Sequence, residues 1–264
     1  MVNLYFVPTP IGNLNDMTLR GVEVLKSCDV VYSDDVDKTK QLLSYYNIEK
    51  PLYCYKNNKE ELFNYLSDNK AVAIVSGEGY SGVDGDSHLI CQEAIEKGYN
   101  ITVLPGANYL LTGLVTSGIP CDKFLYCGFL DQEHIKEEVE KIIDFDRTIV
   151  IYETKQKITD TIKVLYEVLG ERKAVICYNL TKPQEGFIRF TLGEDITIDV
   201  DYDQVVIVLE GAKINSNTKK LNDLDVKEHY KYYLDQGLND KDAMKKVAKD
   251  RGVSKSDIYK LIKI

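Results

Sequence analysis

The stretch from Val72 to Gly106 reads VAIVSGEGYSGVDGDSHLICQEAIEKGYNITVLPG, and its order of elements decides the fold. Val72–Val75 is short, apolar and β-branched, which predicts a buried strand. Four glycines within nine residues, from Gly77 to Gly85, exclude a helix or strand there. A helix around Leu89–Ile95, closed by Gly98, and a strand at Ile101–Leu104 follow. This strand–loop–helix–strand order is typical of a parallel α/β sheet.

The glycine-rich loop, residues 77–86, directly follows the first predicted strand of this stretch. Open α/β sheets bind ligands at the carboxyl ends of their strands. Glycines also let backbone groups approach a ligand, because no Cβ atom stands in the way. We therefore consider a ligand-binding loop here, and a long surface loop is the alternative that spacing alone leaves open.

Composition sets limits on the class of protein. The 264 residues suffice for one large domain or two medium ones, and 44% hydrophobic with 28% charged residues is typical of a soluble globular protein. No segment has the apolar length of a membrane span, and the chain opens on a strand-like run rather than a signal peptide. Six scattered cysteines without a C-x-x-C pair, and three distant histidines, predict reduced thiols and no metal site. We expect a cytoplasmic protein.

Charge is distributed unevenly along the chain. Residues 213–264 hold 13 Lys and Arg against 8 Asp and Glu, a net +5, whereas residues 1–212 hold 20 against 34, a net −14. A basic tail on an acidic body indicates nucleic-acid contact by the tail. A solvated, lysine-rich helical surface would give the same numbers.

The strand–helix alternation continues on both sides of the opening stretch. Predicted strands are Leu4–Val7, Val30–Tyr32, Phe124–Phe129, Thr148–Tyr152, Ala174–Tyr178, Phe187–Thr191 and Val205–Glu210. Predicted helices include Glu60–Leu66, Asn108–Val115, Glu133–Ile143 and Ile158–Leu169. The segment Gly118–Asp122 has the composition of a domain joint. We predict an α/β fold with two α/β domains, residues 1–118 and 122–212, followed by a polar linker at 213–222.

The end of the chain, residues 225–264, predicts a small helical domain. Three short helices are expected at Asp225–Leu234, Asp240–Lys249 and Lys255–Ile262. Asn239-x-x-Asp242 and Ser254-x-x-Asp257 match the capping box, and Gly237 and Gly252 stand where helices would end. The second and third helices form a helix-turn-helix-like pair.

Several longer motifs together resemble those of the tetrapyrrole methylase superfamily of S-adenosylmethionine methyltransferases. The motifs are Val7–Leu14 (VPTPIGNL), Thr18–Arg20, Leu104–Ala107 (LPGA), Leu110–Thr112, Ser117–Asp122, Gly128–Leu130, Tyr152-Glu153 and Leu180–Lys182 (LTK). Within the superfamily, the chain is similar to the branch that methylates a cytidine ribose 2′-oxygen in small-subunit ribosomal RNA. The resemblance runs along the whole chain.

Polar positions depart from that pattern. The family's acidic pair and following Thr-Arg-His-Thr-Arg is Asp34–Lys40 (DDVDKTK) here, and its Ser-Asp-Ala-Gly-Thr-Pro-Gly is Ser76–Gly82 (SGEGYSG). Two histidines after a tyrosine are missing from Tyr55–Glu60, and Lys155–Lys157 (KQK) replaces Pro-His-Arg. The scaffold is kept while the presumed cleft has changed, so either the substrate or the activity differs from the pattern.

The resemblance implies S-adenosyl-L-methionine bound in a cleft between the two α/β domains. The residues it implies for cofactor binding are Pro8, Ser76, Tyr80, Ser81, Gly82, Val83, Asn108, Tyr109, Leu110, Tyr152, Leu180 and Thr181. Core packing is the alternative for Tyr152 and Leu180.

Methyl transfer to a hydroxyl also needs a group that positions it or removes its proton. The acids that match the family are Asp35, Glu153 and Glu185, and the candidates for RNA contact are Lys40, Lys182, Arg189, Lys245 and Lys246. Any of these carboxylates could instead be structural, and Lys182 and Arg189 could be surface charges.

Three functions are consistent with these observations. The first is methylation of small-subunit ribosomal RNA by a homodimer, since the superfamily usually pairs its subunits. The second is a small-molecule, tetrapyrrole-like methyltransferase, against which the helical tail stands. The third is a catalytically degenerate cofactor- or RNA-binding protein, which the changed cleft residues favour.

Overall fold

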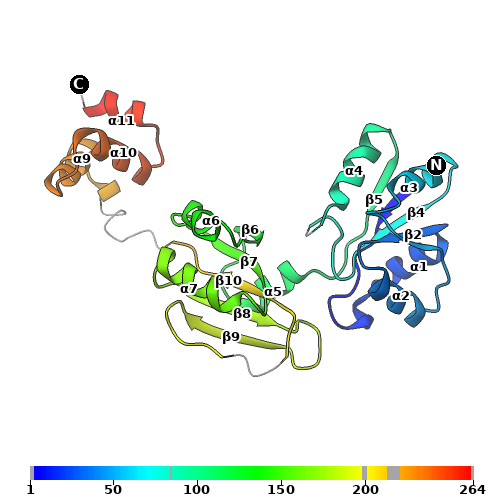
Figure 1. The fold of residues 1–264 in the computed structure, drawn as a ribbon. Coiled ribbons are helices and arrows are strands. Elements are labelled where there is room, and N and C mark those ends of the chain that lie inside the picture. The colour runs from blue at the N-terminus through cyan, green and yellow to red at the C-terminus, as the bar shows by residue number, and fades with distance from the viewer. Residues whose placement is uncertain (1–2, 84, 198–200, 213–220, 263–264) are drawn as a thin grey trace. The chain divides into compact units, whose positions relative to one another are not determined.

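The computed structural model describes residues 3–83, 85–197, 201–212 and 221–262. The chain divides into two compact units between Gly211 and Ala212. The first unit contains two separate five-stranded sheets and the second is helical (Figure 1). Within the described ranges, no helix has both the length and the apolar character needed to cross a membrane. The predicted fold class, α/β with a C-terminal set of helices, is confirmed.

The first sheet is parallel throughout, with strand order β3-β2-β4-β1-β5. Its strands are β1 (Asn3–Phe6), β2 (Val30–Ser33), β3 (Leu52–Cys54), β4 (Val72–Val75) and β5 (Asn100–Val103). Every residue of β2 and β4 is buried, as expected for central strands with both faces covered.

Helices cover both faces of the first sheet. Successive side chains of a strand point to opposite faces, and the central strands are apolar throughout, so both faces must be buried. Val31 and Ala73 face α1 (Leu19–Ser27) and α2 (Val36–Tyr45), where Leu25 and Leu43 complete the core. The opposite face packs on α3 (Lys59–Ser67) and α4 (Ser87–Glu96). The result is a three-layer α/β/α arrangement, with a short 3₁₀ helix at Leu14–Asp16 between β1 and α1.

The second sheet is mixed, with order β6-β7-β10-β8-β9. Its strands are β6 (Phe124–Phe129), β7 (Thr148–Thr154), β8 (Lys173–Tyr178), β9 (Gly186–Thr191) and β10 (Gln204–Leu209). Only β6 and β7 pair in parallel, and β10 runs antiparallel to both of its neighbours. Helices α6 (Ile135–Lys141) and α7 (Ile158–Leu169) cover one face.

The other face of the second sheet packs on α5 (Tyr109–Ser117), the helix that follows the first sheet. The side chains on this face include Val150, Tyr152 and Val206. Gly113 permits the close approach, since a Cβ atom at this position would lie 2.8 Å from a Val206 methyl group. The helix therefore connects the two α/β parts through packing as well as through the chain.

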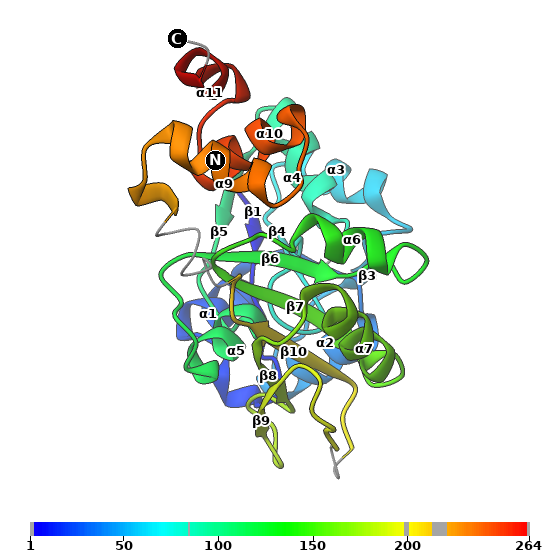
Figure 2. The same cartoon turned by 90° about the vertical axis from the view of Figure 1, so that its left-hand side faces the viewer.

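The helical unit consists of α9 (Val226–Asp235), α10 (Asp240–Asp250) and α11 (Lys255–Ile262), gathered in one small bundle (Figures 1 and 2). Val247 and Ile258 are fully buried at its centre. Both predicted N-caps are present: the Asp242 amide donates to the Asn239 side chain at 3.0 Å, and the Asp257 amide to the Ser254 hydroxyl at 3.2 Å.

A buried polar network ties α9 to the end of α10. His229 is completely buried, its Nδ1 accepts from Arg251 Nε at 3.1 Å, and its Nε2 lies 3.2 Å from an Asp250 carboxylate oxygen. Tyr233 donates to the same carboxylate. Burial is the main cause that lowers the pKa of His229, so the ring is neutral and donates through Nε2.

The strand and helix predictions hold for the long, patterned elements, and the left-handed glycines at 98 and 170 end helices as predicted. The three-residue strand β3 was not predicted, because so short a run carries no periodicity. The expected linker at 213–222 lies mostly outside the described residues.

Candidate functional site

A cavity of about 200 Å³ lies at the carboxyl ends of β2 and β4, and we call it the cleft pocket. The first α/β part provides most of its wall, while Phe129 at the end of β6 and Gln204 at the start of β10 close it from the second. The lining residues are Asp34, Asp35, Lys38, Ser76, Gly77, Glu78, Tyr80, Gly82, Gly85, Tyr109, Phe129 and Gln204.

The glycine-rich loop is fixed from both sides. Gly79 pairs with Thr9 through two backbone hydrogen bonds of 2.9 and 3.0 Å, and the Tyr80 hydroxyl accepts from the Gly106 amide at 3.0 Å. Gly79 and Gly82 have φ angles of +73° and +95°, which only glycine adopts without strain. Residues 77–82 of the loop can therefore present their backbone to the pocket in a fixed conformation.

Two adjacent carboxylates enter the pocket beside Gly77. Asp34 accepts from the Gly77 amide at 2.9 Å, and Asp35 caps α2 by accepting from the Lys38 amide at 3.0 Å. A Cβ atom on residue 77 would lie 2.9 Å from that of Asp35. The absence of a side chain at Gly77 is what lets Asp35 pack against the loop.

Glu78 is the third carboxylate of the pocket and the most connected. One of its oxygens, Oε1, lies 3.2 Å from Lys38 Nζ and 3.5 Å from Lys182 Nζ. The other accepts from the Tyr109 hydroxyl, which also donates to the Ile11 carbonyl oxygen at 2.8 Å. Burial and the neighbouring Glu78 charge raise the pKa of Tyr109, so this phenol stays protonated.

The Tyr55 hydroxyl borders the pocket without a hydrogen-bond partner among the described residues. Its oxygen lies 3.6 Å from the position that a Cβ atom on Gly85 would occupy. The Ser81 hydroxyl, which acts to lower the pKa of this phenol, is itself bonded to Ser87 at 2.6 Å. Burial, with a smaller contribution from Asp34, raises the pKa of Tyr55 to about 12. Since Tyr55 does not itself line the pocket, its hydroxyl is available only to a polar ligand group that reaches past Gly85.

The charges of the pocket suit a cationic ligand group next to an anionic one. Among the described residues, three carboxylates line it against one lysine, and Lys182 adds a second ammonium group at Glu78. Ligand cavities usually have volumes of roughly 300–1,000 Å³. Since the cleft pocket holds about 200 Å³, a ligand of nucleoside size has to extend beyond it.

The sequence profile of the tetrapyrrole (corrin/porphyrin) methylases matches residues 3–195. The chain belongs to this family. It is accordingly a methyltransferase, and the helical unit lies beyond the matched segment.

Curated relatives extend the likeness along nearly the whole chain. Ribosomal RNA small subunit methyltransferase I of Bacillus subtilis is 36% identical over 97% of this chain and 92% of that protein. The protein of the same name from Halalkalibacterium halodurans is 33% identical over 98% and 93%. That of Thermotoga maritima is 31% identical, with 75% of this chain aligned to 91% of it.

Solved structures share the fold at low sequence identity. A cobalt precorrin-4 methyltransferase superposes with a TM-score of 0.58 and 15% identity, covering 79% of this chain and 94% of that chain. The methyltransferase CobJ gives a TM-score of 0.61 at 16% identity, covering 80% and 94%. These values establish the family fold for the α/β part and leave the substrate open.

Five of the residues predicted for the site line the cleft pocket: Asp35, Ser76, Tyr80, Gly82 and Tyr109. Others of the predicted cofactor set lie next to it. The ring of Tyr152 contacts those of Tyr109 and Phe129 at centroid distances of 6.3 and 5.7 Å. Pro8 packs behind Gly106, and Asn108 caps α5 by accepting from the Leu111 amide.

The remaining members of the predicted cofactor set take supporting places. Leu180 packs in the core between α5 and the second sheet, where Leu110 also contributes. Thr181 accepts from the Asn13 amide at 3.0 Å, which joins the two α/β parts. Ser81 bonds to Ser87, and Val83 is exposed on the loop.

Two of the three predicted acids lie away from the pocket. Glu153 points to the face of β7 covered by α7, is 2% exposed, and accepts from Gln132, Thr154 and Thr161. These bonds give Glu153 a structural place on the side of the sheet covered by α7, away from the lining of the cleft pocket. Glu185 is exposed and accepts from the Thr181 amide at 3.1 Å.

The residues predicted for RNA contact are dispersed. Lys182 reaches the pocket through Glu78, whereas Lys40 lies on the exposed side of α2 and Arg189 donates to the Thr116 carbonyl at 2.6 Å. Lys245 and Lys246 are exposed on α10.

Seven described lining residues were outside the predicted set of site residues: Asp34, Lys38, Gly77, Glu78, Gly85, Phe129 and Gln204. The signal for Asp34 was its place in the acidic pair, and the signal for Glu78 was its place in the glycine-rich loop. Phe129 and Gln204 come from the other α/β part, and no local pattern marks them.

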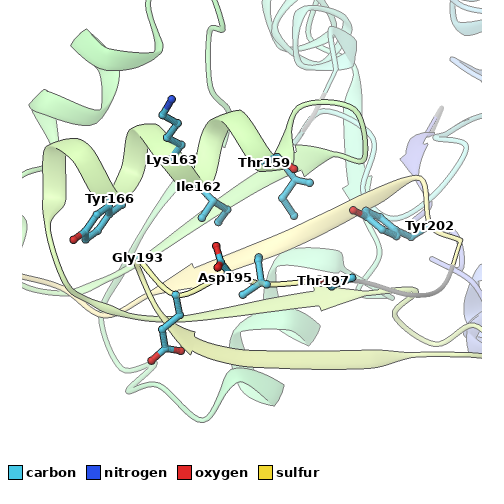
Figure 3. Close-up of a pocket in the computed structure, with 11 residues that line it drawn as sticks. Thr159, Ile162, Lys163, Tyr166, Gly193, Asp195, Thr197 and Tyr202 are labelled. Atoms are coloured by element: carbon cyan, nitrogen blue, oxygen red, sulfur yellow. The ribbon is translucent and has the colours of Figure 1, made fainter.

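A second cavity, of about 470 Å³, lies on the outer side of the second sheet between α7, residues 193–197 and Tyr202 (Figure 3). Lys163 and Tyr166 come from α7, and Asp195, Thr197 and Tyr202 from the connection between β9 and β10. Residues 198–200, next to Thr197, lie outside the described ranges. We assign no role to this cavity.

A pair of matched variants tests the two phenols of the site. Tyr109→Phe removes a hydroxyl with two acceptors and should lower the free energy of unfolding by about 1–2 kcal/mol. Tyr55→Phe removes a hydroxyl without a hydrogen bond and should leave that free energy unchanged or slightly higher. Urea unfolding of the ligand-free protein measures both. Equal losses for the two variants would show that Tyr55 is bonded in the free protein.

Proposed function

We propose that the protein transfers a methyl group from S-adenosylmethionine to the ribose 2′-oxygen of a cytidine in small-subunit ribosomal RNA. The observation that carries this proposal is the likeness, over 97% of the chain, to a protein named ribosomal RNA small subunit methyltransferase I. As part of the same proposal, the enzyme acts in the cytoplasm.

The cleft pocket fits S-adenosylmethionine in three respects. Three glycines of the loop, Gly77, Gly82 and Gly85, line the pocket, and a residue without a side chain lets backbone groups approach a nucleoside. A ligand group that passed Gly85 to reach the buried Tyr55 hydroxyl would meet no competing hydrogen bond among the described residues. The carboxylates of Asp34 and Asp35 suit a sulfonium cation, since opposite charges attract strongly in a partly buried site. When bound, the cofactor supplies an activated methyl group.

The chain's own residues must then align the acceptor oxygen and take up its proton, because methyl transfer is an in-line displacement. We propose that the Asp34–Asp35 pair does this, as both carboxylates line the pocket and are half-buried. Each has one oxygen engaged by a backbone amide, at Gly77 and Lys38 respectively. Those bonds hold the carboxylates in place and leave the second oxygen of each without a hydrogen bond to the described residues.

The proposed activity is tested by incubating the protein with radiolabelled S-adenosylmethionine and small ribosomal subunits that lack the modification. Label in RNA, mapped by nuclease digestion to a 2′-O-methylcytidine, is the expected result. Cofactor binding without transfer to the subunits would favour the degenerate binding protein. Transfer to a porphyrinoid and not to RNA would favour the small-molecule enzyme.

The cofactor site is tested by Gly82→Val. A β-branched side chain at φ +95° is strained and would fill backbone space beside the pocket, so S-adenosylmethionine affinity should fall at least about tenfold. Gly98→Val is the matched control, because φ is +75° there but no atom lies within 4 Å of the new Cβ position. Calorimetric titration measures both variants. Wild-type affinity in the Gly82 variant would place the cofactor elsewhere.

We also propose that the protein is a homodimer, since a two-fold pair is the commonest closed assembly. Exposed apolar side chains at Leu111 and Val115 on α5 and at Phe129 support such a contact. Sedimentation velocity at micromolar concentration should show a dimer, and a monomer alone would contradict it.

We propose that the helical unit supplies the long-range attraction for RNA. Lys241, Lys245, Lys246 and Lys249 are exposed on α10, while Met244 and Val247 on its other side are buried. An acidic α/β part repels phosphates, so a basic tail would draw the RNA to the enzyme. Such contacts position RNA without reading its sequence.

Changing both Lys245 and Lys246 to Gln should therefore weaken RNA binding and flatten its dependence on salt, with S-adenosylmethionine affinity unchanged. Binding of small ribosomal subunits between roughly 50 and 200 mM salt measures the slope. Deletion of residues 223–264 should have a larger effect of the same sign. Unchanged affinity and slope in the folded deletion variant would leave the tail a structural role only.

A further inference from the structure

Two lysines from different α/β parts meet on a single carboxylate oxygen at the cleft pocket. Lys38 comes from the first turn of α2, and Lys182 from the turn between β8 and β9. Their ammonium nitrogens lie 3.2 and 3.5 Å from Glu78 Oε1. Two ammonium groups around one anionic oxygen are an arrangement that also binds a phosphate oxygen. Here the carboxylate of Glu78 takes the place that a phosphate would occupy.

The position of Lys182 is built by its surroundings. A Cβ atom on Gly12 would lie 2.5 Å from Lys182 Cγ, so the missing side chain at residue 12 provides room for the lysine stem. The turn that carries Lys182 has left-handed backbone at Asn179, Thr181 and Gln184, with φ between 50° and 67°. Such strain persists only where surrounding bonds maintain it, and the Asn13–Thr181 bond is one of them.

The ion pairs of Glu78 can exchange with a ligand. The side chains of Lys38 and Lys182 are 51% and 29% exposed, so water and incoming anions reach both ammonium groups. Exposed ion pairs contribute little net stability, because each partner is solvated well when the pair opens. Each ammonium also has three donors, of which the bond to Glu78 uses one. Glu78 keeps a partner when the lysines leave, since its Oε2 accepts from Tyr109.

We propose that Glu78 is an anion gate: its carboxylate occupies the Lys38–Lys182 site in the free enzyme, and a phosphate of the RNA strand displaces it during binding. The inference deepens the proposed function and rests on its RNA substrate. The gate would favour RNA over other methyl acceptors. An acceptor without a phosphate at the right distance from its hydroxyl cannot displace Glu78 from the two lysines. The opposite role, in which Glu78 only orients the two lysines, predicts the opposite sign for its removal.

Glu78→Gln separates the two roles. The amide keeps the size of the side chain and can still accept from Tyr109, but it no longer competes with phosphate for the lysines. Fluorescence anisotropy with a labelled 16-nucleotide oligocytidylate RNA should show binding at least about threefold tighter than wild type. Lys38→Gln and Lys182→Gln should each bind more weakly than wild type. Adding Glu78→Gln to the Lys38/Lys182 double variant should give no gain.

Glu93→Gln is the matched control. Glu93 also holds two lysines, Lys59 at 2.5 Å and Lys97 at 2.8 Å, and its side chain is 28% exposed against 21% for Glu78. It belongs to α4 and not to the lining of the cleft pocket. Its variant removes the same charge and frees the same number of ammonium groups, so oligocytidylate affinity should stay close to wild type.

Weaker or unchanged RNA binding by Glu78→Gln would overturn the gate, and so would a gain that persists without the two lysines or appears equally in Glu93→Gln. The methylation assay on small ribosomal subunits is scored separately on the wild-type protein. If the wild-type protein methylates the subunits but Glu78→Gln binds oligocytidylate no more tightly than wild type, the gate is wrong and the proposed function stands. If Glu78→Gln binds oligocytidylate more tightly but the wild-type protein does not methylate the subunits, the proposed function is wrong and an anion site of unassigned purpose remains.

Discussion

The parallel direction of all five strands in the first sheet is the constraint on which the site depends. Parallel strands end at the same edge, so the segments after β1, β2, β4 and β5 must meet there. Three contacts show the meeting: Thr9 with Gly79, Gly77 with Asp34, and Gly106 with Tyr80. Each involves a glycine. A Cβ atom would lie 2.9 Å from Asp35 at Gly77 and 2.7 Å from Pro8 at Gly106, whereas Gly79 has a φ of +73°, which favours glycine. The glycine-rich loop is thus part of how the sheet edge closes as well as a place for a ligand.

The second α/β part completes the site through a narrow junction. Gly12 lies against Leu180 and Thr181, where a Cβ atom would come within 2.8 Å of both, and the Asn13 amide donates to Thr181. The same strained turn carries Lys182 to Glu78. On the other side, Gly113 lets α5 pack closely on Val206. Val206 lies two residues along β10 from Gln204, which lines the pocket. Glycines at two junctions therefore position Lys182 and Gln204 of the second part beside the carboxylates of the first.

Sequence reasoning recovered what local pattern encodes. The helix starts capped by Asn239 and Ser254 follow from hydrogen bonds within a few residues. The buried strand Val72–Val75 and the strand–loop–helix order follow from the local apolar pattern. Five predicted site residues reached the pocket because the family motifs place them on loops at the sheet edge. Glu153 looked like a catalytic acid but faces α7, since neighbouring residues of a strand point to opposite sides and its neighbour Tyr152 faces α5. Gln204 and the pairing of Glu78 with Lys182 depend on contacts about a hundred residues apart, which no window of sequence contains.

The division of charge along the chain gives the arrangement a physical logic. A net −14 over residues 1–212 suits a pocket for a cationic methyl donor but opposes a polyanionic acceptor. The family match ends at residue 195, and the structural relatives cover about 80% of the chain, so the basic helical unit lies outside the shared fold. Long-range attraction and chemistry would then be assigned to different units, one basic and one acidic. In that division the pocket itself needs only a few cations at short range, and Lys38 and Lys182 are the two that the structure places against its carboxylates. Holding them on Glu78 keeps the site close to neutral until a phosphate arrives, which reconciles a carboxylate-rich cleft with an RNA substrate.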